Sequence, residues 1–140
     1  GEYQLTTALE NLKSKGANFI PKKVSNWLDF GTPKNLLDSH KFILNQEQPA
    51  ISSKHYKNTK IYPPCNIAKG VIIENSTIGP HVSIAKGCKI SDSVIKNSII
   101  QTNTRIYNAN LDNSILGKNV VFNQKFKSVN IGDYSQLNTL

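Results

Sequence analysis

Large apolar residues recur at a short and regular spacing from residue 61 onward. They are Ile61, Ile67, Ile73, Ile78, Ile84, Ile90, Ile95, Ile100, Ile106, Leu111, Leu116 and Phe122, each five or six positions after the last. From Ile67 on, a smaller residue (Cys, Val, Ser, Thr or Ala) stands two positions before each of them. Because residues i and i+2 of a strand face the same side, each repeat predicts a short strand that points one small and one large side chain inward.

The distance between every third repeat predicts how these strands stack. Three repeats span 17 residues from Ile61 to Ile78, 17 from Ile78 to Ile95 and 16 from Ile95 to Leu111. A sandwich of hairpins would need tight Asn-Gly or Asp-Gly turns, and neither dipeptide occurs. We therefore predict a mainly β fold, a parallel β-helix of about four turns with three strands in each. Residues 129–131 would add a last rung.

The same register predicts the place of both cysteines. Cys65 falls in a column with Val82, Ser98 and Ser114, and Cys88 in a column with Val71, Thr104 and Val120. The two thiols therefore lie on different walls, which indicates small buried side chains rather than a disulfide or a CxxC metal or redox pair. Free thiols fit a reducing compartment, so we expect a cytoplasmic protein.

The first part of the chain has helical spacing followed by short extended runs. Leu5, Ala8, Leu9 and Leu12 predict one amphipathic helix. A capping box at residues 7–10 would begin this helix, and Gly16 would end it. Short strands are predicted at residues 17–20 and 24–30.

A second helix is predicted after Thr32, which is a suitable N-cap with Pro33 in the first helical position. Its apolar face would carry Leu36, Leu37, His40, Ile43 and Leu44. On this face His40 is expected to be a packed histidine at the boundary of the core rather than a ligand.

These few elements cannot cover their own apolar faces, since domains of this size are only marginally stable without disulfides or a bound metal. We therefore expect residues 1–45 to be the last piece of a larger α/β domain. Residues 46–60 would be a linker, and residues 61–140 the β-helix.

Charge and hydropathy exclude two classes of partner. The 17 Lys and Arg outnumber the 9 Asp and Glu, but residues 1–60 and residues 61–140 each carry +4 and neither holds a dense block. A basic and aromatic stretch at residues 54–62 is interpreted as a solvated connector, so no nucleic acid is expected. No run of about 18 apolar residues is present, so no membrane contact is expected.

Two motifs in the first part are typical of one enzyme family. Residues 1–6 read Gly-Glu-Tyr-Gln-Leu-Thr and residues 27–33 read Trp-Leu-Asp-Phe-Gly-Thr-Pro. They resemble the G-E-x-E/Q-I/L-T and W-x-D-x-G-T/N-P motifs near the end of the catalytic domain of sugar-1-phosphate nucleotidylyltransferases. Residues 61–122 resemble the hexapeptide-repeat family of left-handed β-helices. The left hand is implied by that resemblance alone, because parallel crossovers are otherwise right-handed.

The resemblance implies an activity for a longer parent protein. The parent would join a nucleoside triphosphate to a sugar 1-phosphate and release pyrophosphate, with Mg²⁺ held by carboxylates. Asp29 matches the Mg²⁺ carboxylate of the family, and Glu2 matches the carboxylate that binds the sugar hydroxyls. Without the resemblance, Asp29 would be interpreted as a turn residue ahead of Gly31, and Glu2 as a frayed terminal residue. Trp27 is interpreted as a packing residue.

The family's Gly-rich nucleotide loop does not occur in these 140 residues. We therefore expect a C-terminal part that forms no nucleotide sugar by itself, and the nucleobase and the sugar stay open. The β-helix would serve assembly or regulation, and a homo-oligomer is expected.

Two alternatives come from other classes. One is a hexapeptide acyltransferase that binds acyl-CoA and uses His81 as general base. His81 stands next to the inward Val82 and so points outward, where an exposed corner residue is the simpler interpretation. The other alternative is a purely structural oligomerisation module.

Overall fold

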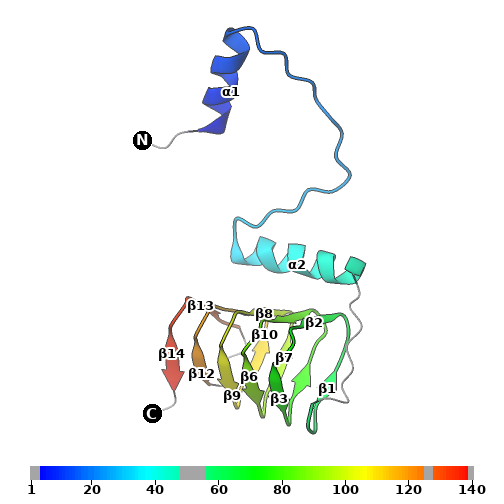
Figure 1. Cartoon of the computed structure of the whole chain (residues 1–140), viewed down its shortest axis with the longest axis vertical. Coiled ribbons are helices and arrows are strands. Elements are labelled where there is room, and N and C mark those ends of the chain that lie inside the picture. The colour runs from blue at the N-terminus through cyan, green and yellow to red at the C-terminus, as the bar shows by residue number, and fades with distance from the viewer. Residues whose placement is uncertain (1–3, 48–55, 125–127, 139–140) are drawn as a thin grey trace.

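The computed structural model describes residues 4–47, 56–124 and 128–138, and it contains two helices and a parallel β-helix (Figure 1). Helix α1 (Leu5–Ser14) lies apart from the β-helix, at the far end of an extended segment. Helix α2 (Pro33–Glu47) lies along one wall of the β-helix. The chain therefore changes character where α2 begins.

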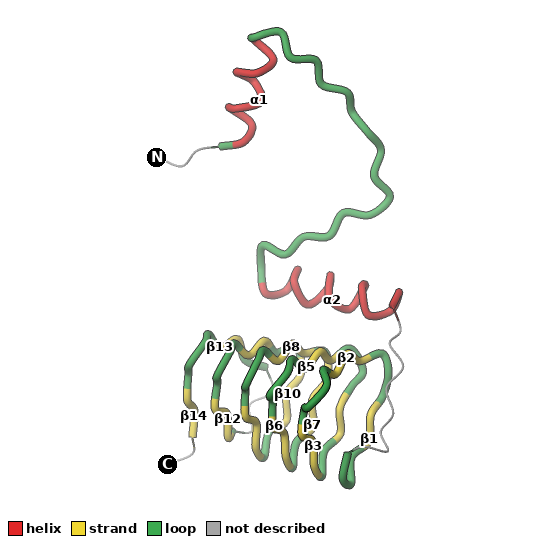
Figure 2. The backbone as a smooth tube through the Cα atoms, in the orientation of Figure 1, coloured by secondary structure: helices red, strands yellow, loops and turns green. Residues whose placement is uncertain are grey.

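Three parallel sheets form the walls of the β-helix, and the chain passes from one to the next in turn (Figure 2). The first wall holds β1 (Lys60–Ile61), β4 (Thr77–Ile78), β7 (Val94–Lys96) and β10 (Asn110–Asp112). The second holds β2 (Cys65–Ile67), β5 (Val82–Ile84), β8 (Ser98–Ile100), β11 (Ile115–Leu116) and β13 (Asn130–Ile131). The third holds β3 (Ile72–Glu74), β6 (Lys89–Ser91), β9 (Arg105–Tyr107), β12 (Val121–Asn123) and β14 (Gln136–Asn138). The predicted parallel β-helix is confirmed, and its arrangement fits a left-handed β-helix.

The predicted register is confirmed as well. Ile78 pairs with Ile61 on one side and with Ile95 on the other, and Ile95 pairs in turn with Leu111. These columns form a closed apolar core, in which the side chain of Ile95 is 0% exposed. The last predicted rung is also present, since β13 pairs with β11.

The cysteines occupy the predicted columns. Cys65 pairs with Val82, and both Cys65 and Cys88 are buried free thiols. Each thiol donates to a backbone carbonyl, Cys65 to Tyr62 at 3.2 Å and Cys88 to Gln101 at 3.0 Å. Burial raises the pKa of both thiols, so they are inert core side chains as predicted.

Asparagine and aspartate form the corner between the third and first walls. Asn75 and Asp92 both have positive φ, a backbone conformation that these short polar side chains tolerate. The amide of Asn58 donates to Asn75 at 3.2 Å, and that of Asn75 donates to Asp92 at 3.2 Å. The corner is thus held by a ladder of side chains from successive turns.

Helix α1 ends as predicted but begins differently. Gly16 has φ 88°, and its N–H and that of Ala17 donate to Lys13 and Leu12 of the last turn, which satisfies two terminal carbonyls. The predicted capping box is wrong, because the helix already begins at Leu5 and Thr7 lies inside it. The N-cap is Gln4, which makes no side-chain capping bond.

The two strands predicted at residues 17–20 and 24–30 are absent from the described structure, where both stretches are extended without strand pairing. A strand needs a neighbour for its N–H and C=O groups, and no described segment lies beside these stretches to supply one. The prediction of these two strands is therefore wrong for the described structure, in which Ser25 lies at a bend.

Helix α2 begins as predicted and covers the second wall. The N–H of Asn35 donates to the Thr32 hydroxyl at 3.1 Å, so Thr32 caps the helix and Pro33 opens it. Leu44 and Ser39 are buried on the covered face. The helix continues to Glu47, two residues into the predicted linker. No helix among the described residues has the length and apolar character to cross a bilayer.

Candidate functional site

Asp29 lies in the extended segment just before α2, and its carboxylate organises the entry to that helix. Oδ1 accepts the N–H of Gly31 at 2.7 Å, and Oδ2 accepts the side-chain amide of Asn35 at 2.6 Å. These two bonds, that of Gly31 first, hold the pKa of Asp29 below its ordinary value. The group is therefore an ionised and solvent-exposed carboxylate at neutral pH.

The backbone of Asp29 is also fixed to α2. The hydroxyl of Ser39, a buried residue of that helix, donates to the Asp29 carbonyl oxygen at 2.8 Å. Three residues of the helix region thus hold one aspartate, two through its side chain and one through its main chain. The position of Asp29 consequently follows the position of α2.

The surroundings of Asp29 can be tested against a magnesium ion. Mg²⁺ is bound in proteins through one or two carboxylates together with substrate phosphates. Asp29 fits as one such ligand, since it is ionised and exposed and each oxygen keeps a second lone pair beside its turn hydrogen bond. No group of three His, Cys, Asp or Glu that could hold a metal occurs among the described residues. The turn role of Asp29 is observed, and its metal role stays a prediction.

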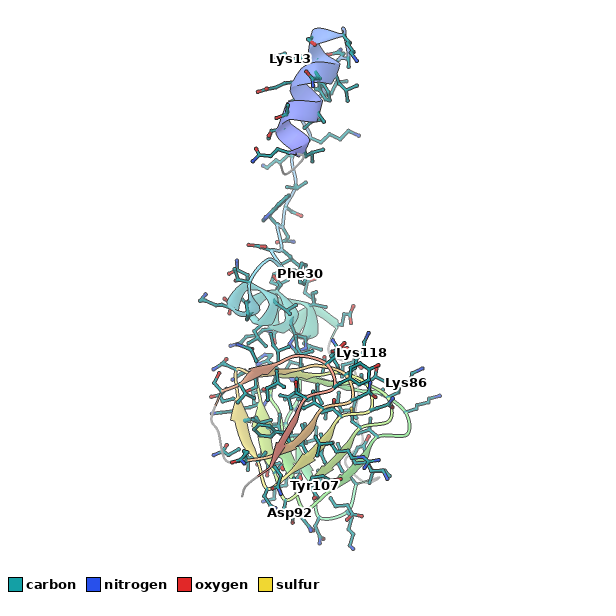
Figure 3. All side chains as sticks on the ribbon, turned by 90° about the vertical axis from the view of Figure 1, so that its left-hand side faces the viewer. Lys13, Phe30, Lys86, Asp92, Tyr107 and Lys118 are labelled. Atoms are coloured by element: carbon teal, nitrogen blue, oxygen red, sulfur yellow. The ribbon has the colours of Figure 1, made fainter. Side chains whose placement is uncertain are left out.

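The structure describes some of the other residues of the two motifs and leaves Glu2 out. Glu2 lies outside the described residues. Trp27 is 86% exposed, so the packing predicted for it is not found within the described part of the chain. Phe30 lies near the first turn of α2 (Figure 3) and is half exposed.

Two open hollows flank the first turn of α2 where it meets the last turns of the β-helix. One of about 400 Å³ has Phe30, Pro33 and Leu36 on one side and Ile115 and Ile131 on the other. The second, of about 590 Å³, has Thr32, Leu37 and Asp38 facing Asn113 and Asn130. The docking of α2 thus brings the second motif against the β-helix, a contact that no spacing in the sequence predicts.

His81, the candidate base of the acyltransferase alternative, is not an exposed corner residue. It points away from the core as predicted, but its Nε2 lies 2.9 Å from Oδ1 of Asn45 in α2. The side chain is therefore partly covered. Burial lowers its pKa, the charge of Lys41 adds to this effect, and the Asn97 side chain partly opposes it. His40 is packed at the boundary as predicted, with Nε2 2.7 Å from Oγ of Ser83.

Stacking also assembles a cationic hollow that was not foreseen. Lys89 and Arg105 are paired neighbours on the third wall, and with Asn103 and Asn119 they line a space of about 390 Å³. Lys86 and Lys118 lie at the adjoining corner (Figure 3). These cations are scattered along the sequence, so a search for consecutive basic residues misses them. The predicted register, which places residues 16 apart side by side, was the signal that could have found them.

No family model matches the chain. Two curated relatives are similar to it. A glucose-1-phosphate thymidylyltransferase of Streptomyces antibioticus is 25% identical over 161 aligned positions, which cover 98% of this chain and 45% of the relative. A glucose-1-phosphate thymidylyltransferase of Streptomyces griseus is 23% identical over 139 positions, which cover 86% of this chain and 39% of the relative. The chain spans less than half the length of these relatives, and the similarity confirms the resemblance stated from the motifs.

Proposed function

We propose that this chain is the C-terminal part of a nucleotidyltransferase that makes a nucleotide sugar from a nucleoside triphosphate and a sugar 1-phosphate. The observation that carries this proposal is the similarity to two glucose-1-phosphate thymidylyltransferases along nearly the whole chain. The ionised carboxylate of Asp29, within the motif that resembles the family, adds support. The β-helix would serve assembly or regulation of the parent enzyme.

The proposed reaction explains why a carboxylate is needed. For pyrophosphate to leave, a phosphate oxygen of the sugar 1-phosphate attacks the α-phosphorus of the triphosphate, and the bond from that phosphorus to the bridging oxygen breaks. Both reactants are anions, so their approach requires positive charge. Bound Mg²⁺ would supply that charge. In this chain Asp29 would hold the ion, and Glu2 would accept hydrogen bonds from the sugar hydroxyls.

The parent is proposed to act in the cytoplasm as a homo-oligomer. Cys65 and Cys88 are buried free thiols, which is the state that a reducing compartment maintains. Exposed apolar side chains at Leu5, Val24 and Trp27 favour further packing, either within the parent or between copies. No observation on the described residues favours the acyltransferase alternative, since its candidate base His81 lies against α2.

The test of this function is Asp29→Asn in the full-length parent, assayed by pyrophosphate release at saturating Mg²⁺. We expect turnover to fall at least about a hundredfold, which is about 3 kcal/mol in the barrier, because Asn keeps the shape but loses the charge. The melting temperature should change little, because the Asn35 amide can rotate to offer its oxygen instead.

Asp38→Asn is the matched control. Asp38 is an exposed carboxylate of helix α2, and among the described residues it pairs with Lys34 at 2.8 Å. Such an exposed ion pair contributes little to stability, so its loss should leave the fold and the turnover unchanged. Turnover of the Asp29 variant within a few-fold of the parent, with the control intact, would show that Asp29 holds no metal.

A further inference from the structure

Helix α2 and the β-helix hold each other through a reciprocal pair of histidines. His40 of α2 places Nε2 2.7 Å from Oγ of Ser83 in β5. In return, His81, at the corner just before β5, places Nε2 2.9 Å from Oδ1 of Asn45 in α2. Each element thus contributes one imidazole and one small polar partner. Both bonds cross the same interface.

The second nitrogen of each ring is the unusual feature. Nδ1 of His40 and Nδ1 of His81 are both buried, and neither has a hydrogen-bond partner among the described residues. His81 must donate from Nε2, since the amide oxygen of Asn45 only accepts, so its neutral ring carries a lone pair at Nδ1. Protonation of His81 puts a charged N–H at Nδ1, and protonated His40 likewise carries an N–H at its unpartnered Nδ1 and can no longer accept from the Ser83 hydroxyl at Nε2. This costs the desolvation of the charged group, and only at His81 does a neighbouring side chain, that of Asn97, offset part of the cost.

Burial and the neighbouring positive charges both lower the pKa of the two histidines. Burial is the main cause that lowers the pKa of His40, and the charge of His81 adds to it. Burial also lowers the pKa of His81, the charge of Lys41 adds to this, and the Asn97 side chain partly opposes it. The charged and titratable groups that act on the pair are therefore Lys41 from α2 and the other histidine. No carboxylate of the described residues is among them.

The interface is connected to Asp29 through α2. Ser39, next to His40 in the sequence, donates to the carbonyl oxygen of Asp29, and Asn35 in the first turn donates to its carboxylate. A shift of α2 on the β-helix would therefore carry Asp29 with it.

We propose that His40 and His81 are positioning residues, which in their neutral forms hold α2 on the second wall and so fix Asp29 relative to the β-helix. The docking of α2 stands on the geometry alone, whereas its importance for Asp29 rests on the function proposed above. The docked state disfavours protonation, so docking is complete above the ordinary histidine pKa of about 6.5 and weakens as the pH falls below it. Each histidine contributes up to about tenfold per pH unit.

The docking is tested on this chain by hydrogen exchange of the α2 amides at pH 7.5 and pH 5.5, expressed as protection relative to an unstructured peptide. We expect protection of residues 39–47 to fall between about tenfold and a hundredfold, while that of residues 98–107 in the β-helix stays constant. The double variant His40→Gln and His81→Gln keeps an amide near each Nε2 position and cannot titrate. Its α2 should remain protected at both pH values.

The third histidine, His55, supplies the control, since His55→Gln should retain the full pH response. Protection of α2 that does not change with pH in the unaltered chain would overturn the proposal. So would an equal pH response in the double Gln variant. Should the Gln variants fail to dock at pH 7.5, the single variants Ser83→Ala and Asn45→Ala provide a second test. Each should lower α2 protection at pH 7.5, and unchanged protection in both would again overturn it.

The link to Asp29 is tested in the full-length parent. His40→Ala with His81→Ala should lower kcat with little change in KM, and the double Gln variant should restore kcat and remove the loss of rate between pH 6.5 and 5.5. A purely structural role would move the melting temperature but not this pH profile. If Asp29→Asn left turnover intact while α2 protection still followed pH, the proposed function would fail and the docking would stand. If Asp29→Asn abolished turnover while the protection of α2 did not change with pH, the proposed function would stand and the histidine docking would fail.

Discussion

The β-helix and the segment of residues 4–32 carry similar proportions of apolar side chains, yet only the β-helix buries them. Ile78, Ile95 and Leu111 are 0% exposed, whereas Leu5 is 74% and Trp27 86% exposed. The difference lies in where the packing partner stands in the sequence. In the β-helix the partner of each residue lies one turn away in the same chain, while the segment meets no such partner among the described residues.

The hydrogen bonds of the backbone follow the same rule. Strands of only two or three residues persist in the β-helix because the next turn accepts their N–H groups, as Ser93 does for Thr77 at 2.8 Å. Residues 17–20 and 24–30 have strand-like sequences but no described strand beside them. A repeat thus supplies its own pairing, and a piece of an α/β sheet does not.

The largest expected effect is on the core of the β-helix. Ile95→Asp should lower the free energy of unfolding of this chain by about 4 kcal/mol or more, because an unpaired carboxylate would enter a closed apolar column. Val94→Asp is the matched control, since Val94 is the preceding residue, points outward and is 44% exposed. Chemical denaturation followed by circular dichroism measures both. Equal stability of the two variants would contradict the register.

A smaller effect is expected from two glycines that share a positive φ but differ in their surroundings. A Cβ at Gly79 would overlap the backbone oxygen of Tyr62 in the preceding turn, whereas at Gly70 it would meet nothing within 4 Å. Gly70→Ala should therefore cost only the left-handed conformation, about 1 kcal/mol. Gly79→Ala adds the overlap and should cost about 3 kcal/mol. If thermal denaturation gave the same loss of stability for both variants, the close contact between turns would not be what requires glycine at position 79.

The smallest effect is expected in the exposed segment. Trp27→Ala should change the unfolding free energy of this chain by less than about 0.5 kcal/mol, because the side chain contacts little. Trp27 is the single tryptophan, so its fluorescence reports its surroundings directly. Emission should be that of a solvated indole in this chain and shift to shorter wavelength in the full-length parent. A solvated spectrum in the parent as well would contradict the idea that Trp27 belongs to a larger domain.

The sequence by itself determined the β-helix to the level of individual residues. Its register, the columns of Cys65 and Cys88 and the last rung at Ile131 all follow from spacing, because stacked turns repeat one local geometry. The start of α2 at Pro33 follows equally from its local capping residue Thr32. Such features depend on neighbours that are near in the sequence or placed at a fixed period.

Only the tertiary structure decided the rest. His81 lies 36 residues from its partner Asn45, and His40 lies 43 residues from its partner Ser83. No periodicity in the sequence predicts either contact. The turn of Asp29 ahead of Gly31 was a prediction from the sequence, whereas its link to Ser39, ten residues further on in α2, was not. The reason is physical. The contacts of a docked helix depend on the shape and polarity of two whole surfaces. A local or periodic pattern in the sequence shows neither property.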